Sequence, residues 1–91
     1  MKTLFLSGKF KKDYKRYKRY PTKVEALKKV LRMLRDEHPI PPEYKPHMLK
    51  GQYKGCMECH VEDDYLLIWL DPNTDIIELV RLGSHSELFR K

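Results

Sequence analysis

The chain has 91 residues, which is enough for one domain with a modest core and leaves no room for a second domain. Hydrophobic residues make up 41% of the sequence and charged residues 35%, a composition that excludes global disorder and favours a globular protein. The formal net charge is +6, but residues 1–50 hold 15 Lys and Arg against 5 Asp and Glu, whereas residues 51–91 hold 4 against 8. A first half this cationic suits a nucleic acid or an acidic protein, unless it is merely a soluble basic surface.

The first predicted element is a short strand at residues 2–7. Its apolar run ends at Ser7 and Gly8, before a block of lysines, and is too short for a signal peptide or a membrane span. We therefore expect a cytoplasmic protein with reduced cysteines and no membrane contact. Ser7 is expected to cap the helix that follows.

A strongly basic helix is predicted at residues 9–19. Phe10, Tyr14 and Tyr17 are spaced i, i+4 and i+7, so they share one face of this helix. Nearly all the other positions are Lys or Arg, which makes this helix the first candidate for contact with a polyanion.

A second, amphipathic helix is predicted at residues 23–37. The segment Tyr20 to Thr22 interrupts the first helix, and Thr22 with Glu25 three residues later has the spacing of a capping box. The apolar residues of this second helix form one stripe that should face the core, and they are Val24, Leu27, Val30, Leu31 and Leu34.

The rest of the chain is predicted to form a loop, three strands and one last helical turn. Four prolines between Pro39 and Pro46 exclude a helix interior or a central strand there. Short connections at 63–64 and 71–74 favour an antiparallel meander, and residues 84–89 can add one helical turn. We expect one α+β domain over residues 1–91, in the order β-α-α-β-β-β, with two N-terminal helices packed on a small antiparallel sheet whose meander strands are residues 56–62, 65–70 and 75–82.

The stretch from Cys56 to His60 matches C-x-x-C-H, the spacing of covalent haem attachment. We reject this reading, because haem attachment of that kind requires export and the chain shows no export signal. In a strand, residues three apart point to opposite faces, so Cys56 and Cys59 should diverge and neither a disulfide nor a zinc site is easily made. We expect no metal or other cofactor, one buried cysteine (Cys59) and one cysteine on the face shared with His60.

Four histidines have side chains that titrate near neutral pH. His38 lies at the end of the second predicted helix, where a cation favours the helix dipole, and that structural role is sufficient for it. His47, His60 and His85 lie on three separate segments, each near a strand or loop end. They form one site only if these ends meet at the same edge of the sheet, and spacing alone does not decide that.

Such a cluster of histidines would suit the cleavage of RNA without a metal. A base removes the 2′-OH proton, an acid protonates the leaving 5′ oxygen, and a cation stabilises the charge on the phosphorane. Imidazole can act as base or acid at neutral pH, and each correctly placed group contributes about 10²- to 10⁴-fold. Arg81 offers a planar fork to a phosphate, and Asp64 can orient a histidine or act as a base. Phe89 or Tyr65 could stack on an RNA base.

Three ordered blocks of sequence carry more information than any single residue. They read Y-K-x-H-x-L-x-G-x-x-x-G from Tyr44, H-V-E-x-D-aromatic from His60, and R-x-G-[ST]-H-x-x-L-F from Arg81. In this order and at this spacing, over most of residues 44–89, they closely resemble the YafQ branch of the RelE/ParE toxin superfamily. The basic helical hairpin that precedes them also fits that family.

The resemblance implies a RelE-like fold and the toxin half of a type II toxin–antitoxin pair. Its implied activity is ribosome-dependent cleavage of translated mRNA in the A site, by metal-free acid/base chemistry that inhibits translation. The implied partners are a cognate antitoxin of the DinJ/RelB kind, in a hetero-oligomer with the toxin, and the ribosome with its mRNA. We interpret the Lys9–Lys23 block as the surface that holds ribosomal RNA, with candidate contacts at Lys11, Lys12, Lys15 and Arg16.

The resemblance also implies roles for individual residues. His85 is expected to be the general acid, His60 or Asp64 the base, and His47 the residue that orients the phosphate. The implied role of Arg81 is to stabilise the phosphate. Phe89 is the expected aromatic, and Tyr65 stands where the family often has Trp, beside the acidic Asp64.

Three other functions fit parts of the sequence. A ParE-like toxin that targets gyrase has the same fold but lacks the nuclease site, and a non-enzymatic RNA-binding module would use only the basic helices. The three histidines argue against both, because neither function needs them. An inactive relic of a toxin is the third alternative, although no residue change in this chain demands it.

Overall fold

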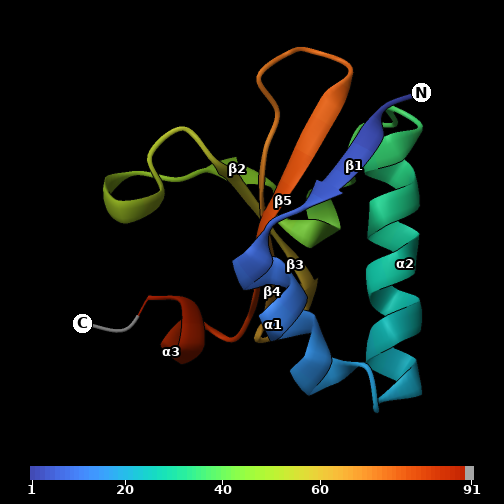
Figure 1. The fold of residues 1–91 in the computed structure, drawn as a ribbon, viewed down its shortest axis with the longest axis vertical. Coiled ribbons are helices and arrows are strands. Elements are labelled where there is room, and N and C mark those ends of the chain that lie inside the picture. Colours follow the sequence, from blue (N-terminus) through green and yellow to red (C-terminus); the bar gives the residue numbers. More distant parts are fainter. Residues whose placement is uncertain (90–91) are drawn as a thin grey trace.

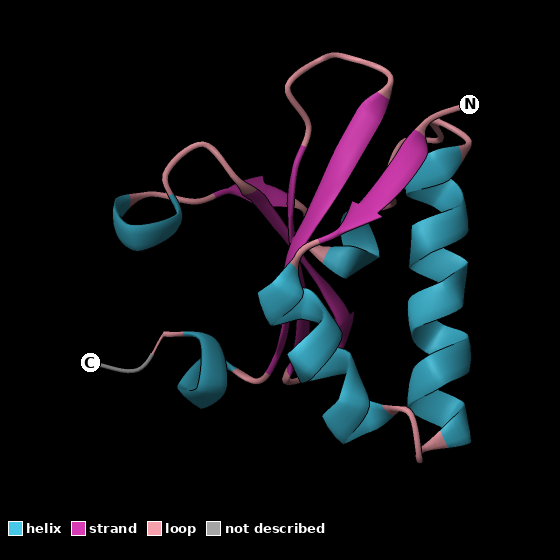
Figure 2. Ribbon diagram, viewed as in Figure 1, coloured by secondary structure: helices cyan, strands magenta, loops and turns pink. Residues whose placement is uncertain are grey.

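The computed structural model describes residues 1–89 and shows strands and helices in the order β1, α1, α2, β2, β3, β4, β5 and α3 (Figures 1 and 2). Two 3₁₀ turns, η1 and η2, lie on either side of β2. The α+β class and the predicted helices and strands are confirmed, and β2 is an additional strand. The bounds are β1 (Thr3–Leu6), α1 (Gly8–Tyr17), α2 (Pro21–Arg35), η1 (Pro42–Tyr44), β2 (His47–Met48), η2 (Gly51–Tyr53), β3 (Met57–Glu62), β4 (Tyr65–Leu70), β5 (Ile76–Gly83) and α3 (His85–Leu88).

The strands form one sheet in the order β1-β5-β4-β3-β2. β3, β4 and β5 make the predicted antiparallel meander. The expectation of a purely antiparallel sheet was wrong, because β1 pairs in parallel with β5 and makes the sheet mixed. This pairing joins the two ends of the chain, so no local sequence pattern reports it. β2 pairs with β3 in the antiparallel sense and places His47 opposite Glu58.

The two long helices cover one face of the sheet and close the main core. Ser7 caps α1 as predicted, since its hydroxyl accepts a hydrogen bond from the Phe10 N–H at 3.0 Å. The core includes Phe10 and, from α2, the buried members of its apolar stripe, Leu27, Val30 and Leu34. Burying each of these side chains contributes about 1.5–3 kcal/mol of transfer free energy. The stripe therefore fixes α2 against the sheet, as its spacing predicts.

The start of α2 differs from the prediction. The helix begins at Pro21, its N-cap is Tyr20, and no side chain caps it. The predicted capping box of Thr22 and Glu25 is wrong. A proline at the first helical position already has a helical φ and has no N–H that needs a partner, so the helix starts before the box.

The opposite face of the sheet carries a smaller apolar cluster that supports α3. Its buried members are Leu66 and Ile68 of β4 and Leu88 of α3, with Tyr53 and Phe89 packed against them. β4 is buried on both faces, because it is the central strand between the two clusters. The cluster holds α3 beside the ends of β3 and β4, where the candidate site lies.

The two cysteines lie in different layers, as predicted for residues three apart in a strand. Cys59 belongs to the main core and Cys56 to the smaller cluster, and both are free thiols. Burial raises the pKa of the Cys59 thiol to about 12, so it is inert at neutral pH. Among residues 1–89, no helix has the length and hydropathy needed to cross a membrane.

Candidate active site

Side chains from β3 and α3 meet at one end of the sheet. Glu58, His60 and His85 each place one nitrogen or oxygen atom within 4.8 Å of those of the other two. The rings of His60 and His85 lie 5.8 Å apart between centroids. Two of the three predicted histidines therefore converge, although 25 residues separate them in the chain.

Asp64 joins this group through His85. The Asp64 Oδ1 atom accepts the backbone N–H of His85 at 2.9 Å and lies 2.8 Å from the His85 Nδ1 atom. The backbone and then the side-chain hydrogen bond from His85 hold the pKa of Asp64 below its usual value. An ionised Asp64 implies that Nδ1 of His85 carries a proton, which leaves Nε2 for another partner.

His60 is oriented by the turn that follows its strand. Its Nδ1 atom lies 3.0 Å from the main-chain oxygen of Asp63, an acceptor, so we assign the ring proton to Nδ1. The Nε2 atom then keeps its lone pair when the ring is neutral. The side chain is half-buried, and it is therefore accessible to a substrate.

His47 reaches the same cluster through Glu58. The β2–β3 register places these two residues opposite each other, and the His47 Nε2 atom lies 3.2 Å from Glu58 Oε1. The His47 Nδ1 atom lies 2.8 Å from the main-chain oxygen of Lys45. Both ring nitrogens thus face oxygen atoms, which fixes the ring between the Lys45 main chain and Glu58.

Glu58 is the functional candidate that the sequence analysis did not select. Its side chain is 2% exposed, and its Oε2 atom has no hydrogen-bond partner among residues 1–89. A buried carboxylate is costly unless it is paired, so one that keeps a bare oxygen is a strong indication of a functional site. The available signal was its position two residues before His60 on the same face of the strand.

The two predicted aromatic residues have different positions. Phe89 is half-buried, and its ring lies 6.0 Å from that of His85 and 5.6 Å from that of Tyr53. Tyr65 is 1% exposed and packs in the main core against Tyr17, with ring centroids 4.8 Å apart. The prediction that Tyr65 stacks on an RNA base does not fit this position, because its alternation in β4 turns the ring toward the helices.

Arg81 is half-buried, and its guanidinium lies in an ion pair with the buried Asp13. Its Nε and NH2 atoms lie 2.7 Å and 3.1 Å from the Asp13 carboxylate, and its NH1 donates to the Tyr53 hydroxyl at 3.1 Å. Asp13 is 1% exposed. The guanidinium therefore has its charge balanced within the protein, and its contact with a phosphate stays a prediction.

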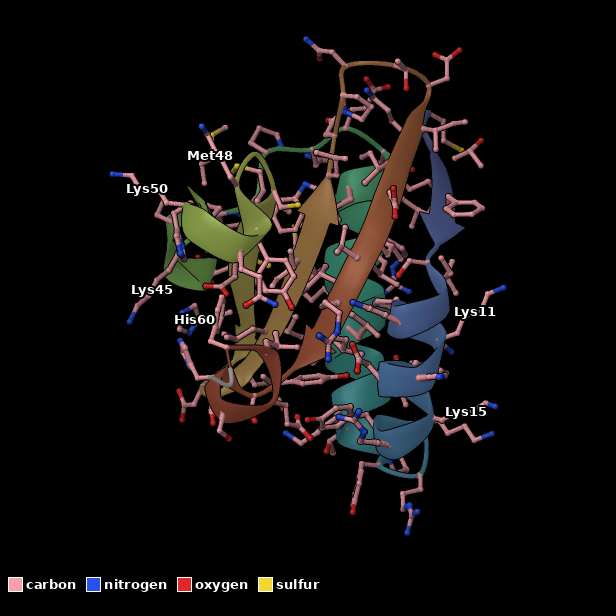
Figure 3. All side chains as sticks on the ribbon, turned by 60° about the vertical axis from the view of Figure 1, so that its left-hand side comes forward. Lys11, Lys15, Lys45, Met48, Lys50 and His60 are labelled. Carbon is pink, nitrogen blue, oxygen red and sulfur yellow. The ribbon has the colours of Figure 1, made fainter. Side chains whose placement is uncertain are left out.

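The basic residues of α1 lie away from the histidines. Figure 3 shows Lys11 and Lys15 extending from the side of the molecule opposite His60, and Lys12 is also exposed. Arg16 is not free, since it pairs with Asp13 and with Glu87. Lys45 is the nearer cation: it lines a cavity of about 230 Å³ together with His60 and Tyr44. Lys45 cannot be recognised from the sequence, because one lysine in a proline-rich loop has no distinguishing pattern.

The same side chains could also hold a metal ion. Glu58, His60 and His85 supply one carboxylate and two imidazoles, a donor set that suits Zn²⁺ or Cu²⁺. The unpartnered Glu58 Oε2 atom adds to this fit, because a metal ligand is one partner that a buried carboxylate accepts.

Comparison with known proteins gives concordant matches over nearly the whole chain. Residues 2–90 match the family model described as a bacterial toxin of the type II toxin–antitoxin system, YafQ. The mRNA interferase toxin YafQ of Escherichia coli K12 is 35% identical over 85 residues, which cover 91% of this chain and 90% of that protein. The crystal structure of a metal-bound toxin from Helicobacter pylori has a TM-score of 0.86 and 43% identity, covering 98% of this chain and 100% of that one. YafQ in the E. coli DinJ–YafQ complex has a TM-score of 0.85 and 31% identity, covering 98% and 99%.

Proposed function

The chain belongs to the YafQ family of bacterial type II toxins, and from that premise we propose that it is an endoribonuclease that cleaves mRNA. The observation that carries the proposal is the meeting of three histidines and two carboxylates at one end of the sheet. Four of these residues, His47, His60, Asp64 and His85, are those that the sequence analysis selects.

His60 is the general base of the proposed reaction. With Nδ1 donating to the Asp63 oxygen, its Nε2 atom is free to take the proton from a ribose 2′-OH. The 2′ oxygen then attacks the adjacent phosphorus, and the bond from phosphorus to the 5′ oxygen breaks. The products are a 2′,3′-cyclic phosphate and a new 5′-OH, and the proton removed from the 2′ oxygen stays on His60.

His85 is the general acid. Its protonated Nε2 atom donates a proton to the leaving 5′ oxygen, which completes the proton balance. The contact of Asp64 with His85 Nδ1 at 2.8 Å fixes the ring and places a carboxylate beside it. Asp64 therefore supports the acid, and the geometry favours His60 over Asp64 as the base.

His47 supplies positive charge beside the phosphate. It is held between the Lys45 oxygen and Glu58, so a proton on each ring nitrogen would have an acceptor. A fixed cation in a partly enclosed site stabilises the charge that develops on phosphorus at low reorganisation cost. Phe89, next to His85, is placed to stack on the base of the cleaved nucleotide.

A metal ion is a second possible occupant of this site, since the related H. pylori toxin is metal-bound. Glu58, His60 and His85 would hold it in this chain. A bound divalent ion would supply positive charge to a phosphate oxygen. In the mechanism proposed above, the same imidazoles need their nitrogens for proton transfer, so ion binding and this chemistry compete.

The proposed partners follow from the family. YafQ of E. coli forms a complex with DinJ, and we assign to this chain a cognate antitoxin of that kind. We also assign it a place in the cytoplasm, where it acts on mRNA that the ribosome is translating. The exposed lysines of α1 are the candidate contacts with ribosomal RNA.

The test is reporter translation with purified ribosomes, with new 5′ ends mapped by primer extension. The unmodified chain should cleave the mRNA, and the His60→Ala/His85→Ala double variant should not. His38→Ala is the matched control, because His38 is an exposed histidine outside the cluster. Cleavage that persists in the double variant would contradict the mechanism. Inhibition of translation without cleavage would favour the non-enzymatic module, and inhibition of gyrase would favour the ParE-like alternative.

A further inference from the structure

The helix that carries His85 is too short to be stable alone. α3 has four residues, and the first turn of a helix is unfavourable to form because few hydrogen bonds offset the ordering of the backbone. His85 is its first residue. The orientation of this imidazole therefore depends on contacts that other elements make with α3.

A capping box fixes the start of α3. The Ser84 hydroxyl accepts the Glu87 N–H at 3.2 Å, and the Glu87 carboxylate accepts the Ser84 N–H at 2.9 Å. Gly83 makes room for this fold-back: a Cβ atom there would lie 2.7 Å from Glu87 Oε1. Glu87 therefore sets the direction of the chain between the end of β5 and His85.

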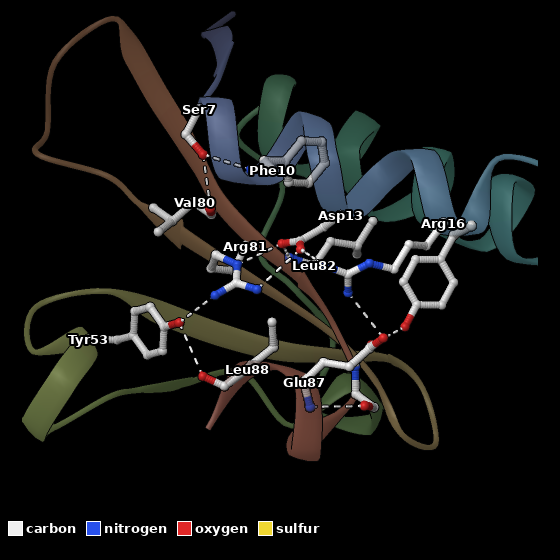
Figure 4. Close-up of polar contacts among 12 residues, drawn as sticks. Ser7, Phe10, Asp13, Arg16, Tyr53, Val80, Arg81, Leu82, Glu87 and Leu88 are labelled. Carbon is white, nitrogen blue, oxygen red and sulfur yellow. Dashed lines mark hydrogen bonds and ion pairs between the residues drawn. The ribbon is translucent and has the colours of Figure 1, made fainter. Parts of the chain in front are cut away.

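Two side chains of helix α1 bind the Glu87 carboxylate. The Tyr17 hydroxyl donates to Glu87 Oε1, and Arg16 NH1 lies 3.1 Å from Oε2 (Figure 4). Burial raises the pKa of Glu87, but hydrogen bonds from Tyr17, the Ser84 N–H and Arg16 outweigh it and leave the pKa below its usual value. The carboxylate thus stays ionised and keeps its donors at neutral pH.

The same face of α1 holds the strand that leads into α3. Asp13 is three and four residues before Arg16 and Tyr17, so the three share one helical face. The Asp13 carboxylate accepts the Leu82 N–H at 3.0 Å and binds Arg81. Figure 4 shows this contact continuing from Arg81 to Tyr53, whose hydroxyl donates to the Leu88 oxygen at the other end of α3.

We infer that Tyr17, Arg16 and Glu87 are positioning residues of the nuclease: they set the orientation of α3 and, through it, the contact between His85 and Asp64. This inference rests on the proposed function, in which His85 is the general acid. It gives Arg16 an intramolecular role, the contact with Glu87, in place of the RNA contact that the sequence predicts.

The test compares kcat and KM of ribosome-dependent cleavage in Tyr17→Phe, Glu87→Ala and Glu87→Gln. Tyr17→Phe keeps the ring that packs on Tyr65 and removes only the hydroxyl. We expect Tyr17→Phe and Glu87→Ala to lower kcat about 10- to 100-fold at unchanged KM, because a small displacement of an acid is enough for such losses. Glu87→Gln can still cap Ser84 and should recover part of kcat. Tyr20→Phe, in an exposed tyrosine after α1, should leave kcat unchanged.

Hydrogen exchange at the His85 amide is the second measurement. Exchange should accelerate in Tyr17→Phe and Glu87→Ala, well below their unfolding temperatures, while core amides keep their protection. An unchanged kcat in both variants overturns the inference, as does a rise in KM alone or an equal loss in Tyr20→Phe. His85→Ala distinguishes a failure of the proposed function from a failure of the positioning role. If the His85→Ala variant still cleaves mRNA, the proposed function is wrong. If His85→Ala abolishes cleavage but Tyr17→Phe keeps its full kcat, only the positioning role is wrong.

Discussion

His60 and His85 each have one ring nitrogen fixed by a neighbour and another left for substrate, whereas both ring nitrogens of His47 face acceptors. His60 is fixed by a main-chain oxygen, His85 by Asp64, and His47 by both kinds of acceptor. These contacts come from turns and from the β2–β3 register. The histidines were recognisable from their motifs, but the protonated nitrogen of each ring follows only from these partners, which lie on separate elements.

The sequence patterns predict the burial of individual side chains less well than they predict the strands and helices. The chemistry of Arg81 and Tyr65 suits a phosphate and a base, yet Tyr65 lies in the core and Arg81 is half-buried in an ion pair. The alternation of residues in a strand shows which side chains share a face, but it does not show which face packs against another layer when both faces are apolar. β4 is covered on both faces, and Glu58 is buried although a glutamate in a strand is usually exposed.

The Asp64–His85 contact makes a prediction about pH. The folded-state pKa of Asp64 lies below its unfolded value, so this contact stabilises the fold fully above the unfolded pKa, near 3.9, and the stabilisation is lost as pH falls through the folded pKa. We expect Asp64→Asn to lower the melting temperature at pH 6–7 and to match the unmodified chain at the acid end. Thermal unfolding between pH 2.5 and 7 measures the difference. A gap that is independent of pH would contradict an ionised Asp64.

The donor set of the site makes a prediction about metals. If the imidazoles transfer the protons, a chelator that binds Zn²⁺ but leaves the Mg²⁺ of the ribosomes should leave cleavage unchanged, and added Zn²⁺ should inhibit it by occupying Glu58, His60 and His85. Glu58→Gln removes the charged ligand and should weaken both Zn²⁺ binding, measured by calorimetry, and the inhibition. Loss of activity in that chelator that Zn²⁺ restores would instead make the ion a participant in the reaction.

At the scale of elements, α1 holds other elements in place through its polar side chains, in addition to presenting basic residues. Its apolar residues pack on the core as their spacing predicts, while Asp13, Arg16 and Tyr17 hold β5 and α3. The predicted strands and helices were found within a few residues of their expected bounds. β2 was missed because two residues carry no periodicity, and the parallel β1–β5 pair because it is long-range in sequence.

The buried pair of Asp13 and Arg81 makes a prediction about stability. Asp13→Ala leaves the Arg81 guanidinium and the Leu82 N–H without their acceptor inside the protein. Breaking one side of such a pair costs about 3–5 kcal/mol in free energy of unfolding. Urea denaturation measures this change, with Lys12→Ala as the control on the exposed side of α1. A loss below 1 kcal/mol would show that solvent or a neighbouring group replaces Asp13.

At the scale of the whole molecule, charge and chemistry lie on different surfaces. Lys11 and Lys15 extend from one side, and His60 lies on the other, with Lys45 and Lys50 nearer to it (Figure 3). This arrangement fits a protein that is held on a large polyanion by one surface while another meets the scissile phosphate. The net charge of the first half indicated a polyanionic partner, but only the fold separates the cations of α1 from those beside the site.

This separation predicts that the α1 lysines affect binding and not the chemical step. Lys11→Glu, Lys12→Glu and Lys15→Glu, combined, should raise KM for ribosomes and leave single-turnover kcat at saturating ribosomes unchanged. Because each phosphate contact contributes about 0.7–0.9 to the slope of log K against log salt, the triple variant should flatten that slope by about 2–3. The control is Lys28→Glu/Lys29→Glu on α2, which adds similar charge elsewhere. Unchanged ribosome binding at physiological salt would show that α1 is not part of the interface. If the α2 control loses ribosome binding to the same extent, the effect of the α1 variant comes from the net charge of the protein and not from the position of these lysines.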